Sequence, residues 1–206
     1  MARKPADQSV SRDAILYAAA DVLQRAGYEA TTMKDIAAEV NLTAASLYHH
    51  FRNKDELLLA VLEAGLDVVI GRLEPIVGSG LGCADRLRAM ISVHIVAQTE
   101  NTAVAAAMVF EIRSLLAEGA GYHERRRQFF ARRDHFEDMY RRVIAEGVEK
   151  GAFHPVDVPI FVKAMLGAHN WVSVWYRPAG RLSGQEIADR MADTFLHSLL
   201  AEGPRV

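Results

Sequence analysis

Two adjacent histidines, His49 and His50, are the side chains whose types and spacing first raise a chemical question. They lie in the stretch SLYHHF at residues 46–51. Histidine can serve as a metal ligand, as a catalytic base or as a contact to another molecule. On a helix, consecutive residues are separated by about 100° around the axis, so the two imidazoles diverge and are poorly placed to share one metal ion. We therefore expect no metal site at this pair.

The same helical spacing divides this stretch into a core face and an outward face. Leu47 and Phe51 form an apolar pair at i, i+4, which we expect to be buried. Ala45, Ser46 and His49 fall on the opposite face. The function of the outward face depends on the elements that position it.

The residues just before and within this stretch, MKDIAAEVNLTAASLY, predict two short helices joined by a tight turn. Asn41 can adopt the left-handed conformation that ends a helix, and Thr43 can cap the next helix. This is a helix-turn-helix, whose second helix lies in the major groove of DNA. The small residues Ala45 and Ser46, followed by His49, suit a close approach to base edges. Thr43 and the flanking Tyr48 are placed to bind phosphate oxygens.

The remaining sequence predicts helices almost throughout, and thus an all-α fold. We expect an N-terminal three-helix headpiece with the helix-turn-helix, residues 1–56, joined to a larger helical domain for ligand binding and dimerisation, residues 57–206. The glycine-rich stretch GSGLGC at 78–83 is predicted to be a linker or hinge between a small bundle and a large one. The predicted helices cover residues 11–26, 33–40, 44–50, 54–77, 84–99, 102–118, 121–150, 157–177 and 184–201.

Composition narrows the class of protein. The 206 residues are 50% hydrophobic and 24% charged, which is typical of a globular protein. No apolar run approaches the roughly 20 residues of a membrane helix, and the N-terminus lacks the apolar segment of a secretory signal. Cys83 is the only cysteine, so an intramolecular disulfide is excluded and a cytoplasmic location is expected. The net charge of −2 favours no class of partner.

The stretch ATTMKDIAAEVNLTAASLYHHFRNKDELLLAVL, residues 30–62, resembles the DNA-binding segment of the tetracycline-repressor (TetR) family of bacterial transcriptional regulators. The matching motifs are T-x-x-D-I-A at 32–37, S-L-Y-H-H-F at 46–51 and N-K-D-E-L at 53–57. One departure is Asn41, where glycine is usual, and asparagine tolerates the same backbone conformation.

This resemblance implies a homodimer that reads a palindromic operator in double-stranded DNA, usually as a repressor. A small molecule bound to the C-terminal domain would release the DNA, and no cofactor or membrane would be involved. Lys54, at the start of the fourth helix, would meet a phosphate. The residues expected to contact DNA are Thr32, Lys34, Thr43, Ala45, Ser46, Tyr48, His49 and Lys54.

An aromatic stripe in the segment 121–150 is the clearest feature of the C-terminal half. Arg125 and Arg132 lie on one edge of this stripe, and Arg126 and Arg133 lie on the other. Either this is a core helix whose arginines reach out to solvent, or it lines an apolar tunnel with a cationic mouth. Arg113 is a further candidate, although a structural carboxylate partner is equally compatible with its position. The expected ligand-binding residues are Arg113, Arg125, Phe129, Arg132, Phe136 and Tyr140.

Two apolar helical faces near the C-terminus exceed what one subunit needs, which predicts a four-helix dimer seam. The alternative is a purely internal core. The residues expected at the seam combine small and aromatic side chains on the first helix with large apolar ones on the second: Gly167, Ala168, Trp171, Trp175, Met191 and Phe195.

The sequence says less about the identity of the small molecule that would release the DNA. The motif W-Y-R-P-x-G-x-L-S at 175–183 resembles TetR-type regulators of fatty-acid, phenylacetate or steroid degradation, which respond to acyl-CoA thioesters. Regulators of efflux pumps that bind hydrophobic drugs, and a ligand-independent DNA-binding protein acting through a protein partner, remain alternatives. No G-x-S-x-G, phosphate-binding loop, dinucleotide fingerprint or metal-ligand spacing occurs, so we expect no catalytic residues and no enzyme activity.

Overall fold

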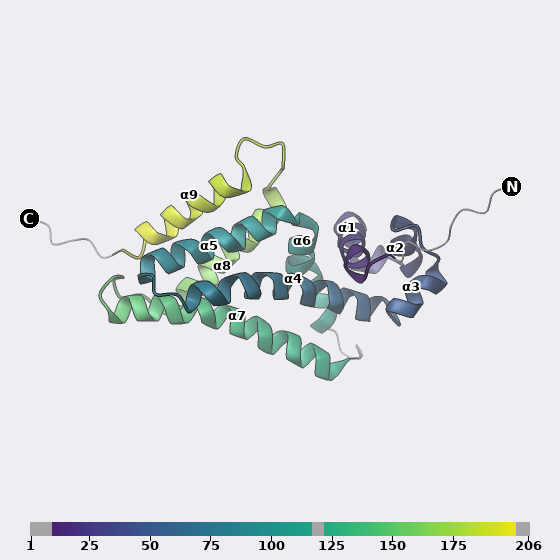
Figure 1. Ribbon diagram of the computed structural model, residues 1–206, viewed down its shortest axis with the longest axis horizontal. Coiled ribbons are helices and arrows are strands. Elements are labelled where there is room, and N and C mark those ends of the chain that lie inside the picture. The colour runs from purple at the N-terminus through teal and green to yellow at the C-terminus, as the bar shows by residue number, and fades with distance from the viewer. Residues whose placement is uncertain (1–9, 117–121, 201–206) are drawn as a thin grey trace, which may run out of the picture.

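The computed structural model describes residues 10–116 and 122–200, and all named elements in these ranges are helices (Figure 1). The all-α prediction is confirmed. The elements are α1 (Arg12–Ala30), α2 (Met33–Glu39), α3 (Ala44–His50), α4 (Lys54–Val77), α5 (Cys83–Glu100), α6 (Thr102–Phe110), a 3-10 helix η1 (Glu111–Leu116), α7 (His123–Glu149), α8 (Val158–Trp175) and α9 (Gly184–His197). The predicted helix ends at 117–118, 121 and 201 lie outside the described residues.

Side chains that cap helix starts account for several of these boundaries. Thr32 accepts a hydrogen bond from the backbone N–H of Asp35, and the Asp35 carboxylate accepts one from the N–H of Thr32. Ser183 and Glu186 form the same reciprocal box at the start of α9. Each box satisfies two N–H groups that the helix itself leaves without a partner. The predicted helix starts at 33 and 184 are confirmed.

Two predicted helices end several residues early in the structure. The segment beginning at Thr102 leaves the α-helical path after Phe110 and continues as η1. Helix α9 ends at His197, although the N–H of Leu200 still donates to the carbonyl of Leu196 at 2.8 Å. The carbonyl of Leu199 accepts from the N–H of His154 at 2.9 Å, so the chain after α9 pairs with the loop that follows α7.

Helix α4 joins the two parts of the molecule, with α1, α2 and α3 at one end in Figure 1 and the larger bundle at the other. It packs against α1 in the headpiece and against α5, α6 and α7 in the larger part. Six consecutive residues, 57–62, are each no more than 2% exposed. The predicted linker at 78–83 is wrong, because this stretch connects α4 to α5, which pack against each other in the same bundle. A continuous helix connects the headpiece instead.

The core of the larger part lies among α4, α5, α7 and α8, with α9 covering α5. Phe153, only 1% exposed, packs directly over the backbone of Gly147. A Cβ atom at position 147 would overlap the Phe153 ring, so this close approach requires glycine. Within the described residues, no helix is both long enough and apolar enough to cross a membrane.

Candidate DNA-binding face and ligand cavity

Helices α2 and α3 form the helix-turn-helix. Asn41 in the turn has φ of 55°, the left-handed conformation expected for it. Thr43 caps α3 by accepting a hydrogen bond from the backbone N–H of Ser46 at 3.0 Å. Leu47 and Phe51 are buried, at 0% and 1% exposure. The predicted core pair and the predicted caps are therefore confirmed, and the opposite face of α3 is directed outward.

The outward face of α3 carries a large polar aromatic side chain beside small ones. Tyr48 is 52% exposed. Ala45 and His49 are exposed, and Ser46 is half-buried. Small side chains let a helix backbone approach base edges, while a tyrosine hydroxyl reaches phosphate oxygens. Of the residues expected to contact DNA, Thr43, Ala45, Ser46, Tyr48 and His49 are brought together on α3, and Thr32 and Lys34 are exposed at the start of α2.

Lys54 has a different environment from the other residues expected to contact DNA. Its Nζ donates to the carbonyl of Tyr28 at 2.6 Å and lies 4.1 Å from the centroid of the Tyr28 ring. The Tyr28 hydroxyl in turn donates to the Asp55 carboxylate. Burial and the adjacent Asp55 raise the pKa of Tyr28, so the phenol remains a donor. These contacts fasten the end of α1 to the start of α4.

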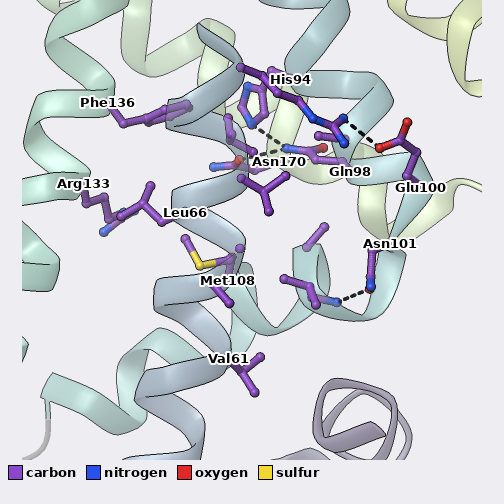
Figure 2. A pocket seen from close by; sticks show the side chains of 18 of the residues that line it. Val61, Leu66, His94, Gln98, Glu100, Asn101, Met108, Arg133, Phe136 and Asn170 are labelled. Atoms are coloured by element: carbon purple, nitrogen blue, oxygen red, sulfur yellow. Dashed lines mark hydrogen bonds and ion pairs between the residues drawn. The ribbon is translucent and has the colours of Figure 1, made fainter. Parts of the chain in front are cut away.

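A cavity of about 640 Å³ lies in the larger part, bounded by α4, α5, α6, α7 and α8, with α1 contributing at one side. Its apolar wall includes Val61, Leu66, Met108 and Phe136 (Figure 2). Ligand cavities typically measure about 300–1,000 Å³ and combine apolar walls with a few polar groups. This cavity has the size and the lining expected for a small hydrophobic ligand.

Charged side chains at the cavity differ in whether they already have partners. Arg72 pairs with Glu100 at 2.7 Å, and Lys163 pairs with Glu137 at 3.1 Å. Arg133, which also lines the cavity, has no hydrogen-bond or ion-pair partner within residues 10–116 and 122–200. Its guanidinium is therefore available to an anionic group of a ligand.

A buried polar cluster connects α5 to α8 beside the cavity. The Gln98 Nε2 lies 2.9 Å from the His94 Nε2 and donates to the Asn170 Oδ1 at 3.3 Å. The Nδ1 atoms of His94 and His169 are 3.3 Å apart. Burial lowers the pKa of His94 to about 4, and burial together with the neighbouring His94 lowers the pKa of His169 well below its ordinary value. Both imidazoles are thus neutral at physiological pH.

Helix α8 presents an apolar face that the described residues leave uncovered. Trp171 is 53% exposed and Trp175 is 48% exposed. The Trp171 ring packs edge-on against the ring of Phe110, itself 49% exposed, with centroids 6.3 Å apart. Large apolar side chains exposed together are typical of a protein–protein interface. The other residues expected at the seam are Gly167, which is exposed, and Ala168, Met191 and Phe195, which are half-buried.

Comparison with known families identifies the fold. Residues 15–61 match the family model described as bacterial regulatory proteins, tetR family, and residues 80–199 match the tetracyclin repressor-like C-terminal domain. The chain belongs to the TetR family. It is a DNA-binding transcriptional regulator and not an enzyme.

Individual TetR-family proteins resemble this chain over nearly its full length. The HTH-type transcriptional repressor KstR2 of Rhodococcus jostii (strain RHA1) is 30% identical over 205 residues, covering 97% of this chain and 98% of the relative. The structure of the ketosteroid transcriptional regulator KstR2 of Mycobacterium tuberculosis superimposes with a TM-score of 0.84 at 26% identity, covering 97% and 100% of the two chains. AibR, crystallised with isovaleryl coenzyme A and operator DNA, superimposes with a TM-score of 0.73 at 32% identity, covering 88% and 96%.

The residues that we expected to bind the ligand do not all lie at the cavity. Phe136 lines the cavity. Arg125 instead forms a two-pronged pair with Glu63 on α4, and Arg132 pairs with Asp67 on the same helix. These two arginines form ion pairs that hold α7 against α4, outside the cavity lining.

The other three expected residues also lie away from the cavity lining. Phe129 is buried in the core at 1% exposure, and the buried Tyr140 donates its hydroxyl hydrogen bond to the carbonyl of Met90 at 3.1 Å. Arg113 is exposed on η1. The α7 arginine at the cavity is Arg133, which lies on the opposite edge of the aromatic stripe from Arg132. The helical pattern marks both edges, but the choice between them depends on which helix packs beside α7.

The cluster around His94 was not found from the sequence. His94 and Gln98 are spaced i, i+4 on α5, which is a usable signal that they share a helix face. Their partners His169 and Asn170 are more than 70 residues away, so only the tertiary structure brings the four side chains together.

Proposed function

We propose that this TetR-family regulator is a homodimeric repressor in the bacterial cytoplasm that binds a palindromic operator and is released by an acyl-CoA thioester. The observation that carries the proposal is the apolar cavity with Arg133 at its wall. An acyl chain is the part of such a ligand that gains most from apolar burial, and the phosphates of coenzyme A suit an unpaired guanidinium. AibR, a structural neighbour, was crystallised with a ligand of this class and with operator DNA.

The elements around the cavity connect a bound ligand to the DNA-binding face. Leu16 and Tyr17 of α1 contribute to the cavity wall, and α1 packs against both α4 and α6. The Gln24 side chain of α1 reaches the carbonyl of Thr102 at the start of α6. A ligand that moves α4 or α6 therefore moves the base of the headpiece. Release requires that the ligand bind the DNA-free arrangement more tightly than the DNA-bound one.

The exposed apolar face of α8 supports the proposal of a homodimer. A two-fold axis through that face buries Trp171 and Trp175 against their copies, as a self-complementary interface does. Two headpieces related by the same axis read two half-sites of opposite orientation, which is why we propose a palindromic operator. In each headpiece, Thr43, Ser46 and Tyr48 are proposed to contact DNA, together with the other expected DNA-contacting residues.

The test is fluorescence anisotropy of a labelled duplex taken from upstream of the gene for this protein. The duplex is titrated with protein, and then with short, long and aromatic acyl-CoA thioesters beside free coenzyme A. Release by a thioester but not by coenzyme A supports the proposal. Release only by neutral hydrophobic compounds would favour a drug-responsive repressor. Binding that no compound relieves would favour a regulator controlled by a protein partner.

Two neighbouring arginines provide a matched comparison. Arg133→Ala should raise the thioester concentration needed for half release by about tenfold, because the lost interaction is a charge-assisted hydrogen bond. Arg132→Ala removes the same charge one residue away, where the side chain pairs with Asp67 outside the cavity lining. An equal effect of both substitutions would show that net charge, rather than a contact in the cavity, controls the response.

A further inference from the structure

The polar cluster of His94, Gln98, Asn170 and His169 has more hydrogen-bonding capacity than the chain uses. Gln98 and Asn170 both line the cavity, and Figure 2 shows their side chains together with His94. The Gln98 Oε1 is buried without a hydrogen-bond partner in the part of the chain that the structure describes. Buried polar groups are nearly always hydrogen-bonded in proteins, so an exception calls for a physical explanation.

The orientation of the Gln98 amide determines the tautomers of the two histidines. An amide nitrogen can only donate, so the Gln98 Nε2 gives one hydrogen to the His94 Nε2 and the other to the Asn170 Oδ1. The proton of the neutral His94 is then on Nδ1, from which it is donated to the His169 Nδ1. This chain of hydrogen bonds holds the Gln98 amide in one orientation and leaves its Oε1 as an unused acceptor beside the cavity.

Asn170 supplies the complementary group. Its Oδ1 is occupied by Gln98, whereas its Nδ2 has no hydrogen-bond partner among the described residues. The Gln98 Oε1 is fully buried, whereas the Asn170 Nδ2 is not. A free donor and a free acceptor thus belong to two cavity-lining amides that are hydrogen-bonded to each other at 3.3 Å. A hydroxyl group can accept one hydrogen bond and donate another, and it satisfies both at once.

We propose that the cavity selects a ligand whose apolar part carries a hydroxyl group, which accepts from the Asn170 Nδ2 and donates to the Gln98 Oε1. This proposal rests on the proposed function in one respect: it takes the hydroxylated part of the ligand to be the acyl group of a thioester. Small side-chain adjustments of the kind common on binding bring the Gln98 oxygen into contact. An unsubstituted acyl chain leaves both groups without partners, which a site with buried polar groups penalises.

The test compares matched ligands by isothermal titration calorimetry with the full-length protein. One set is octanoyl-CoA and its hydroxylated forms, with the hydroxyl at successive positions along the chain. The second set is free octanoate and the corresponding hydroxyoctanoates, which require no coenzyme A. At least one hydroxylated form in a set should bind about tenfold more tightly than its parent, which corresponds to about 1.4 kcal/mol.

Variants connect that preference to the two amides. Asn170→Leu keeps the branched shape of the side chain, Gln98→Met keeps an unbranched side chain of similar length, and each should reduce the preference for the hydroxylated form to less than twofold. Met108→Leu, at another part of the cavity wall, should leave the preference unchanged. Thermal melts identify any variant that fails to fold. If one amide variant does not fold, the ligand preference of the other amide variant tests the proposal.

The outcomes separate this inference from the proposed function. If hydroxyoctanoates are preferred over octanoate while no thioester binds, the thioester proposal fails and the hydroxyl site stands. If hydroxylated and plain members bind equally in both sets, or if none of them binds, the hydroxyl site is refuted. A preference that survives both amide substitutions also refutes it.

Discussion

Acidification should destabilise this protein through His94. Its imidazole is buried, and burial lowers its pKa from the ordinary 6.5 to about 4. The unfolded chain exposes the same side chain to water, where it binds a proton near pH 6.5. Between these two values the unfolded state holds more protons than the folded state, so stability decreases as the pH falls.

The magnitude follows from the two pKa values. From pH 8 to pH 5, the free energy of unfolding should fall by about 2 kcal/mol through His94 alone. His169, whose pKa is also lowered by burial, acts in the same direction. A loss of this size is a substantial part of the total stability of a typical domain.

Urea unfolding followed by far-ultraviolet circular dichroism at pH 8 and pH 5 measures this loss. The protein concentration is held constant, since the stability of a dimer depends on it. His94→Asn cannot titrate in this range, so its stability should fall by about 2 kcal/mol less than that of the wild type. His197→Asn, at an exposed position, is the matched control. If the wild type and His94→Asn lose equal stability, the reasoning about burial is refuted.

Three further predictions concern other parts of the molecule. Trp175→Arg should give monomers in sedimentation equilibrium, because a buried unpaired charge opposes association; a persistent dimer would exclude the α8 seam. Gly147→Ala should lower the free energy of unfolding by about 1–3 kcal/mol through overlap with Phe153, and a urea midpoint equal to that of the wild type would contradict it. Tyr48→Phe should weaken operator binding in anisotropy titrations by about 1 kcal/mol, as for one lost hydrogen bond. Unchanged affinity would remove its hydroxyl from the contacts.

The headpiece could be predicted closely from the sequence because its signals are local. The Thr32–Asp35 spacing marks a helix start, Asn41 marks the turn, and Thr43 marks the next start, all within a dozen residues. These signals depend on backbone chemistry that does not require knowledge of distant contacts. The apolar pair on α3 likewise follows from helical periodicity alone.

The cavity could not be predicted to the same degree because it depends on packing between distant helices. Helical periodicity places Arg132 and Arg133 on opposite edges of one stripe, and only the position of α4 decides that Arg132 pairs with Asp67 while Arg133 faces the cavity. The polar cluster requires α5 and α8 to meet. The glycine-rich stretch at 78–83 has the composition of a linker, but its flanking helices pack together and make it a turn.

Because α4 runs without a break from the headpiece into the larger bundle, it also determines which fragments of the chain can fold. The run of buried residues 57–62 is covered on every side of the helix, by the headpiece on some faces and by the larger bundle on others. A fragment ending at residue 56 would lose the side chains that complete the headpiece core, together with almost all of the helix that Asn53 caps. The DNA-binding part is therefore not an autonomous folding unit. Heat or urea should unfold both parts in one cooperative transition, and a stable headpiece fragment must retain α4 at least through Leu62.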